Sequence, residues 1–354
     1  MYYKSQFYVF KRTTLCIKRA NCSRYHPVRD IVPARGYLLS QRRHVVGMHT
    51  KIVNRMHSVA HRHHLSHPRG KRFNEENTKW QQDEELSDSE KFQLELDMNT
   101  RKHLEEQAEK ITKKLAHMSH QKPWLENMLF LMQLPGFGVI TGMTVLAAIG
   151  EITRFEDFKK LSSYSGLRPG IEQSGTKNRG KKITKEGRKD PRWAMVEVAQ
   201  RAVKSDPLWK HRFNELCRRM HKDQTIVVIA HRLLALVWYV LSRKQAYRYF
   251  SHERIAYKYL TWSWHLSEAD RAGLTRQQFT RYYLMKLGIG HDLKRTALNP
   301  RYPRRLASEA ELLALRPELN QTEYSFRQVP FDWQTPARER RVGVWKAACE
   351  LKTR

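Results

Sequence analysis

The sequence has little cysteine, and the few cysteines are not grouped. The four are Cys16, Cys22, Cys217 and Cys349. No Cys-x-x-Cys pair and no Cys/His spacing of a zinc finger occurs, so the sequence predicts neither a disulfide framework nor a zinc site. Scattered thiols of this kind are typical of a reducing compartment.

Long apolar runs are also missing. No apolar stretch follows the N-terminal charges, so a signal peptide is not predicted. The most apolar segment, residues 226–241, is short for a membrane span and contains His231 and Arg232, which favours a core helix. We therefore expect a cytoplasmic protein without a membrane partner.

Acidic residues are scarce. Among 354 residues there are 35 Asp and Glu against 66 Lys and Arg, a net charge of +31. Basic surfaces gain most of their affinity for nucleic acids by neutralising phosphates and releasing counterions, so nucleic acid is the first partner to expect. The competing interpretation is a basic protein of ribosomal type without chemistry.

The charge is distributed unevenly. Residues 1–72 contain one acid, Asp30, beside sixteen Lys and Arg, whereas residues 73–97 are strongly acidic. We interpret residues 73–97 as a solvated acidic loop. Residues 1–35 show no sustained periodicity apart from a candidate strand near residues 6–10, and they are predicted to be an irregular N-terminal segment.

Residues 36–122 are predicted to form a helical stalk, because apolar residues recur at spacings of three, four or seven. The first helix carries the seam Leu38, Val45, Ile52, Met56 and Val59, and the second carries Leu104, Ala108, Ile111, Leu115 and Met118. Such helices can pair as an antiparallel hairpin within one chain or as an oligomeric coiled coil, a dimer or a tetramer.

The stalk also carries candidate ligands. Its cations Arg42, Arg43, Lys51 and Arg55 are predicted to contact RNA or DNA. His57 and His61 lie one helical turn apart, but no carboxylate or cysteine nearby completes a metal site, so no metal is predicted to be bound here.

A compact all-α domain is predicted over residues 123–244, which gives a mainly α fold for the chain. The domain opens with Pro135-Gly136-Phe137-Gly138 before an apolar helix. This pattern is typical of a helix-hairpin-helix turn, in which Gly136 and Gly138 would let the backbone approach a DNA phosphate; an ordinary loop-to-helix turn fits it as well.

A glycine- and lysine-rich loop spans residues 168–189. It places Ser174 beside glycine within a ring of cations, and its predicted DNA-binding residues are Gly175, Lys177, Arg179, Lys181, Lys182 and Lys185. A serine that attacks a phosphodiester requires a proton acceptor and nearby positive charge. The loop offers the charge but no histidine, so a simple phosphate grip competes with nucleophilic catalysis.

Residues 245–354 form an aromatic and basic C-terminal extension. Its first part interleaves Tyr257, Tyr259, Trp262 and Trp264 with arginine and lysine. Aromatic residues between cations can stack nucleobases, and they can equally form the core of a small helical appendage. The sequence does not decide between these two interpretations.

The order of motifs carries a resemblance. Leu134–Gly138, Ala147–Gly150, Arg154-Phe155, Leu161–Pro169, Gln173–Gly175 and Ile183–Gly187 follow one another, and the helix Arg192–Ala202 comes next. Together these segments closely resemble the C-terminal transposase domain of the insertion-sequence 110 (116/110/902) family. The stalk also looks like the coiled-coil region of that family, so the resemblance covers about three-fifths of the chain.

The resemblance implies a mechanism. In this family a RuvC-like domain with four acidic residues binds magnesium, the C-terminal domain supplies one serine, and a structured RNA guides the choice of DNA. The serine attacks DNA and is thought to hold it covalently. On this sequence the serine is Ser174, and the implied partners are DNA, a guide RNA and further copies of the chain.

The chain departs from the family pattern at its N-terminus. Only about 35 residues precede the stalk, and they contain one acid, Asp30. Magnesium chemistry on phosphates requires several converging carboxylates, so we expect no cofactor bound by this chain and Mg²⁺ only through the missing acidic domain. The leading expectation is a shortened transposase; the alternatives are an inactive nucleic-acid-binding remnant and a partner that poisons the full-length transposase.

Overall fold

A computed structural model describes residues 33–64, 86–174, 177–244, 247, 251–296 and 303–317. The predictions for residues 1–32, for the acidic segment up to residue 85 and for Gly175 lie outside these residues. The helices are α2 (Pro33–Arg62), α3 (Asp88–Ser119), α4 (Trp124–Gln133), α5 (Val139–Ile149), η2 (Ile152–Arg154), α6 (Phe158–Ser165), α7 (Lys189–Ser205), α8 (Pro207–Cys217), α9 (Lys222–Arg243), α10 (His252–Trp264), α11 (Arg276–Lys286) and α12 (Glu309–Leu315). The strands are β1 (Pro169–Ser174), β2 (Lys177–Ile183), β3 (Arg295–Thr296) and β4 (Arg304–Arg305).

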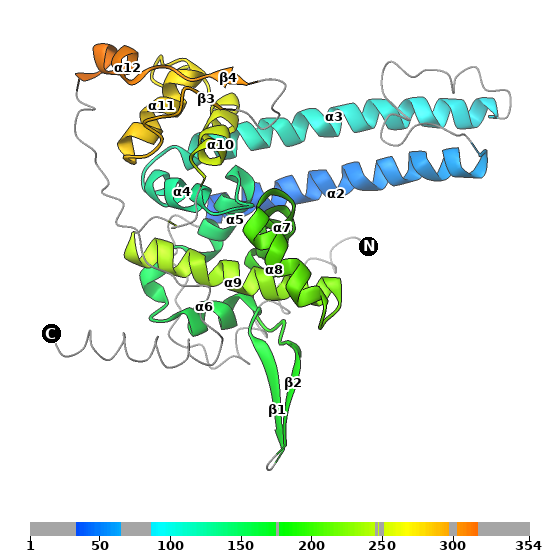
Figure 1. Ribbon diagram of the computed structural model, residues 1–354. Coiled ribbons are helices and arrows are strands. Elements are labelled where there is room, and N and C mark those ends of the chain that lie inside the picture. The colour runs from blue at the N-terminus through cyan, green and yellow to red at the C-terminus, as the bar shows by residue number, and fades with distance from the viewer. Residues whose placement is uncertain are drawn as a thin grey trace. The chain divides into compact units, whose positions relative to one another are not determined.

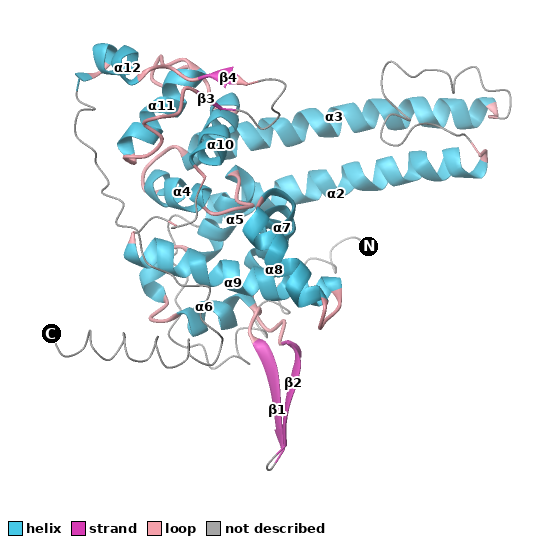
Figure 2. Ribbon diagram, viewed as in Figure 1, coloured by secondary structure: helices cyan, strands magenta, loops and turns pink. Residues whose placement is uncertain are grey.

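The mainly α prediction is therefore confirmed, as Figure 2 shows. The chain divides into two compact units, residues 1–105 and 106–354. The domain boundaries at residues 122 and 244 stay predictions.

In the first unit, α2 and the first part of α3 run antiparallel. His63 contacts Glu90 at 2.9 Å, Arg55 pairs with Asp97, and His49 contacts Glu105 at 3.0 Å, so residue numbers rise on one helix as they fall on the other. A small core lies between the helices, formed by Met56, Val59, Ala60, Leu86 and Leu94. These contacts lie within one chain, and oligomerisation through the stalk stays a prediction.

One boundary of the stalk was predicted wrongly. The acidic loop was expected to end at residue 97, but α3 begins at Asp88, so the acids from Asp88 to Asp97 are helical. The reason is a capping box: the Glu90 backbone donates to Ser87 Oγ at 3.3 Å, and the Ser87 backbone donates to Glu90 Oε2 at 3.2 Å. This reciprocal pair satisfies N–H groups that a helix start otherwise leaves without acceptors.

The second unit is built around α9. This helix contacts α4, α6, α7 and α8, and its inner face buries Ile229, Leu233 and Val237. By length and composition α9 is also apolar enough to cross a membrane, and half of its most apolar window is buried inside the unit. Its packing against four helices is that of a core helix, as predicted.

The expectation of an all-α domain was wrong at the basic loop. Residues 169–183 form an antiparallel two-stranded arm, β1 and β2, which projects from the helices of the second unit in Figure 1. A shorter pair, β3 and β4, lies in the C-terminal extension. Both strands of the arm consist mainly of polar residues. They therefore lack the alternation of apolar and polar residues by which a strand is recognised in a sequence.

Candidate nucleic-acid interface

The arm of β1 and β2 brings the predicted serine opposite a cation. Its register pairs the Cα atoms of Ser174 with Lys177, Glu172 with Arg179 and Ile171 with Gly180. The side chains of residues 171–182 lie outside the described part of the structure, and so does the whole of Gly175. The backbone therefore places Ser174 at the end of β1, and the predicted roles of Ser174, Lys177, Arg179, Lys181 and Lys182 stay predictions.

The root of the arm is held by backbone contacts. The Thr184 backbone donates to Arg168 O at 3.0 Å, and the Lys185 backbone donates to Gly166 O at 3.3 Å. Lys185 has a φ of +56°, and its carbonyl accepts from Arg192 of α7 at 3.0 Å. Gly166 has a φ of +65°, and a β-carbon there would lie 3.1 Å from the Lys185 carbonyl carbon, so any other residue would be strained and crowded at this position.

A second set of contacts joins the arm to α6 and α7. The Arg188 backbone donates to Tyr164 O at 2.9 Å, and its guanidinium donates to Tyr164 Oη at 3.3 Å and to Asp190 at 3.2 Å. Tyr164 in turn donates to Ala148 O at the end of α5, at 2.8 Å. Several motif residues therefore have structural roles, which fix where the arm leaves the helices.

Cations gather at this arm. The segment from Arg168 to Lys189 contains eight Lys and Arg against two acids, Glu172 and Glu186. Arg168, Lys185 and Lys189 are exposed at the root. A projecting basic arm on a rigid root is suited to contacts with a phosphate backbone.

The Pro135–Gly138 turn joins α4 to α5, and its two glycines differ. Gly136 has a φ of +79°, and a β-carbon there would lie 2.1 Å from Val198 O of α7. Its close approach is thus to another helix, which favours the ordinary turn for Gly136. Gly138 caps α5 through Thr141 and has open space beside it. The DNA contacts of Gly136 and Gly138 stay predictions.

The stalk cations also differ from one another. Arg55 donates from Nε to Asp97 Oδ2 at 2.8 Å and pairs with the second carboxylate oxygen, so its guanidinium is already bound within the chain. Lys51 is exposed on the same helix, and Arg42 and Arg43 have interactions of their own. Lys51 is therefore the stalk residue best placed for an external phosphate.

No group of three or more His, Cys, Asp or Glu side chains suited to a metal ion occurs among the described residues.

The aromatic residues of the extension fall into two classes. Tyr259 and Trp262 are fully buried, with Trp262 donating to Ser119 Oγ at 3.0 Å and Tyr259 to Leu129 O at 3.3 Å. They belong to the core, whereas Trp264 is 46% exposed.

Sequence reasoning assigned no structural role to two residues that hold the site together. Arg154 donates to Ile149 O at 3.0 Å and so closes the C-terminus of α5. Lys258 donates to Met132 O at 2.9 Å and to Leu134 O at 2.6 Å, so it closes α4 just before the Pro135–Gly138 turn. The role of Arg154 could have been recognised from the sequence, because a cation shortly after a helix end often binds its last carbonyl groups. The role of Lys258 could not, because the carbonyl groups that it binds are more than one hundred residues away in the chain.

The segment that builds this site is also the part of the chain that resembles known proteins. Residues 128–214, which contain the turn, the arm and α7, match the family described as Transposase IS116/IS110/IS902 family. A transposase for insertion sequence element IS1111A from Coxiella burnetii is 29% identical over 125 residues, 33% of this chain and 34% of that protein. An insertion element IS110 uncharacterized 43.6 kDa protein from Streptomyces coelicolor is 27% identical over 112 residues, 31% of this chain and 28% of that protein.

The chain thus aligns with about a third or less of the length of either relative. The family match, residues 128–214, begins within α4 and ends within α8, and it contains the contacts described above at the root of the arm. Residues 128–214 therefore match the transposase domain of the IS116/IS110/IS902 family.

Proposed function

We propose that this chain acts in DNA transposition by an insertion sequence, with the arm of β1 and β2 gripping a phosphodiester backbone and Ser174 attacking it. The observation that carries the proposal is the arm itself: it lies within the segment that matches the family, and together with its root (residues 168–189) it contains eight cations against two acids. Its register sets Ser174 opposite Lys177.

In the proposed step, Ser174 Oγ forms a bond to phosphorus while one phosphorus–oxygen bond of the DNA backbone breaks. The serine proton passes to a base, and the departing sugar oxygen takes up a proton. Cations of the arm would stabilise the negative charge that develops on the phosphate. We expect the base that accepts the serine proton to come from outside residues 168–189, because this segment contains no histidine.

Magnesium is implied by the family resemblance, but the described residues do not fit it. Two-metal chemistry uses several converging carboxylates, and no such cluster lies in the described part of this chain. We therefore assign no step of the reaction to a metal held by these residues. A guide RNA and assembly into a homo-oligomer are further proposals drawn from the resemblance.

The nucleophile is tested by Ser174→Ala in an assay of DNA cleavage and strand transfer with Mg²⁺, candidate guide RNA and a complete transposase whose own serine is replaced by alanine. We expect activity to fall by about a thousandfold or more, with DNA affinity retained. The matched control is Ser205→Ala, which changes an exposed serine at the end of α7. Full activity in Ser174→Ala would show that Ser174 is not the nucleophile.

The grip is tested by the salt dependence of binding. Replacing Lys177, Arg179, Lys181 and Lys182 by Gln should flatten the slope of log affinity against log salt by about 3, since each phosphate contact contributes about 0.7–0.9. A control with the same charge change replaces four exposed cations: Lys210 of α8, Arg218 and Arg219 of the turn that follows it, and Lys222 of α9. Equal slopes in the two variants would move the interface away from the arm.

A non-catalytic clamp is the second candidate, favoured by the lack of a carboxylate cluster among the described residues. It predicts tight binding, the same dependence on the arm cations, and no cleavage in any combination of RNA and metal.

A further inference from the structure

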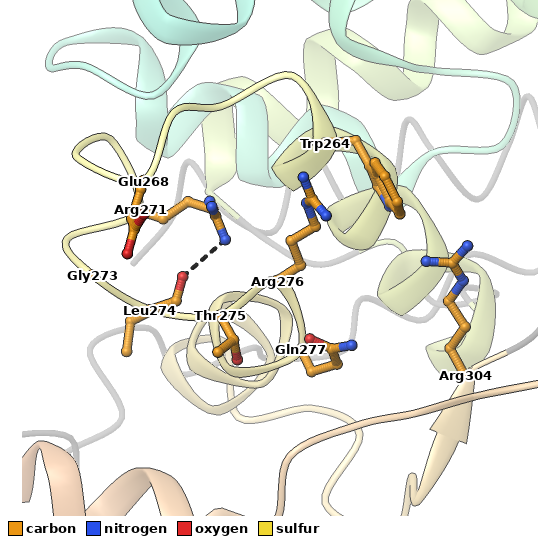
Figure 3. A pocket seen from close by; sticks show the side chains of 9 residues that line it. All are labelled: Trp264, Glu268, Arg271, Gly273, Leu274, Thr275, Arg276, Gln277 and Arg304. Atoms are coloured by element: carbon orange, nitrogen blue, oxygen red, sulfur yellow. Dashed lines mark hydrogen bonds between the residues drawn. The ribbon is translucent and has the colours of Figure 1, made fainter.

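A cavity of about 350 Å³ lies in the C-terminal extension, outside the matched family domain. It is formed where the end of α10, the turn before α11, the first residues of α11 and strand β4 come together (Figure 3). Trp264, Arg276 and Arg304 form one wall, with Glu268, Arg271 and Thr275 among the other lining residues. This size falls at the lower end of ligand sites, which span about 300–1,000 Å³.

Two guanidinium groups are stacked on one indole ring in this cavity. The central carbon of Arg276 lies 3.9 Å from the ring centroid of Trp264, and that of Arg304 lies 5.0 Å from it. In the view of Figure 3 the indole lies between them. Stacking on an aromatic face stabilises a cation but leaves its N–H donors unused.

These donors lack acceptors in the part of the chain that the structure describes. Within it, neither Arg276 nor Arg304 pairs with a carboxylate, and Arg276 Nε is buried without a hydrogen-bond partner. Arg271 differs, because it donates to Leu274 O at 2.9 Å and to Ser267 O at 3.3 Å and so shapes the turn, as the dashed line in Figure 3 shows for Leu274. Buried donors without acceptors favour a ligand that supplies acceptors.

The two arginines are held in place by separate elements. Arg276 is the first residue of α11, whose start is fixed by the reciprocal pair Thr275 and Gln278. Arg304 lies in β4, paired with Thr296 of β3, and Thr296 donates to Glu253 O of α10 at 3.2 Å. The cations are therefore positioned before any ligand arrives, which lowers the entropic cost of binding.

The charge of the cavity selects the ligand class. Three arginines line it against a single carboxylate, Glu268. Guanidinium forks match the paired oxygens of a phosphate, and the chain carries a net charge of +31. We infer that the Trp264–Arg276–Arg304 site binds a phosphate group of a nucleic-acid strand, as a second contact distinct from the arm; the choice of nucleic acid rests on the proposed function.

The test uses the full chain and measures its affinity for labelled single-stranded DNA, duplex DNA and single-stranded RNA. Replacing Arg276 and Arg304 by Gln should weaken at least one of these complexes about tenfold or more, the effect of losing charge-assisted hydrogen bonds. The control replaces Arg295 and Arg305 by Gln, which removes the same amount of charge, all of it from the β3/β4 sheet beside the cavity. The Arg305 side chain is 82% exposed and pairs with the surface residue Glu311 at 3.4 Å.

A second variant separates a built site from general positive charge. Trp264→Leu keeps every cation but removes the surface on which they stack, so a preorganised site predicts a loss of affinity of several-fold, and simple electrostatics predicts none. A thermal melt confirms that each variant is folded. Competition by inorganic phosphate alone distinguishes a small-anion site from a strand-binding site: strong competition at the cavity with unchanged strand affinity in the variants would overturn the inference.

The two proposals fail in different ways. A chain that binds none of the three nucleic acids would refute both. Binding that depends on the arm cations but is equal in the cavity variant and its control would refute the second contact and leave the proposed function intact.

Discussion

The α-carbon of Gly136 packs directly on the backbone of α7, where a β-carbon would lie 2.1 Å from Val198 O and 2.9 Å from Ala202 N. The glycine that resembles a phosphate-binding turn is thus required for helix packing. With a φ of +79° the position is also strained for any other residue.

Gly136→Ala is therefore expected to destabilise the second unit by more than about 2 kcal/mol, from backbone strain and overpacking together. The change should be measured by chemical denaturation of the full chain. Gly138→Ala is the control, since nothing lies within 4 Å of its added methyl group, and it should cost below about 1 kcal/mol. Similar losses for both variants would contradict the packing role.

Asp97 depends on Arg55 in the first unit. The Asp97 side chain is 2% exposed and that of Arg55 is 52% exposed. Arg55→Met leaves a buried carboxylate without its cation, and we expect this to destabilise the helix pair by about 2 kcal/mol, less than a fully buried pair would lose. Hydrogen exchange of α2 and α3 amides measures the effect on this unit alone.

The double variant Arg55→Met with Asp97→Leu tests the cause of this loss. If it is as unstable as Arg55→Met alone, the buried carboxylate is not the cause.

A separate variant, Lys51→Gln, distinguishes a structural role of the stalk from a role in binding nucleic acid. It should leave amide exchange unchanged and lower the affinity for RNA or DNA if the stalk binds it.

Lys258 gives the second unit a pH dependence. Burial lowers the pKa of Lys258 to about 7 from its ordinary 10.5, with the nearby Arg254 contributing, although Asp206 acts in the opposite direction. Between these two values the unfolded chain binds one proton more than the folded chain, so the free energy of unfolding rises with pH across that window. Below pH 7 both states carry the proton, and this group adds no slope.

We therefore expect the stability of the wild-type chain to increase with pH from 7 upward by at most about 1.4 kcal/mol per unit more than that of Lys258→Met. Denaturant titrations at several pH values measure the difference. Parallel curves for the two proteins would show that Lys258 keeps its proton when folded, bound by Met132 O and Leu134 O.

Arg281 holds the C-terminal extension together. It is 3% exposed, donates to Ala307 O and Gly290 O at 2.8 Å each, and also donates to Leu293 O. Arg281→Met should cost about 3 kcal/mol, because carbonyls that its guanidinium satisfies lose a charged donor.

Limited proteolysis between α11 and α12 detects this loss. Arg305→Met serves as the control, since a surface ion pair contributes at most about 1 kcal/mol. Resistance to protease in Arg281→Met would show that the extension is held by other contacts.

Sequence reasoning succeeded where periodicity is strong. The seam of α2 was found because Val45, Met56 and Val59 recur at helical spacing, and all three are buried. The start of α3 was missed although Ser87-x-x-Glu90 is a capping box, because the acidic composition suggested a loop. Leu39 is buried where Leu38 was expected, one residue further along α2.

The candidate sites were less accessible to sequence. The arm escaped detection because its strands carry lysine, arginine and glycine instead of alternating apolar residues. The fate of the C-terminal aromatics depended on tertiary packing: Trp262 and Trp264 are two residues apart, yet one is fully buried and the other is 46% exposed. Local composition is the same for both. Residues two apart face nearly opposite sides of α10, and only the packing shows which side is buried.

The two ends of the arm lie side by side, because the backbone of Thr184 is hydrogen-bonded to Arg168 and that of Lys185 to Gly166. A segment that begins and ends at adjoining points can be shortened, lengthened or exchanged while α6 and α7 keep their positions. Transposases with this root could therefore acquire new arms by small insertions and deletions, and an engineer could graft a foreign hairpin there without redesigning the rest.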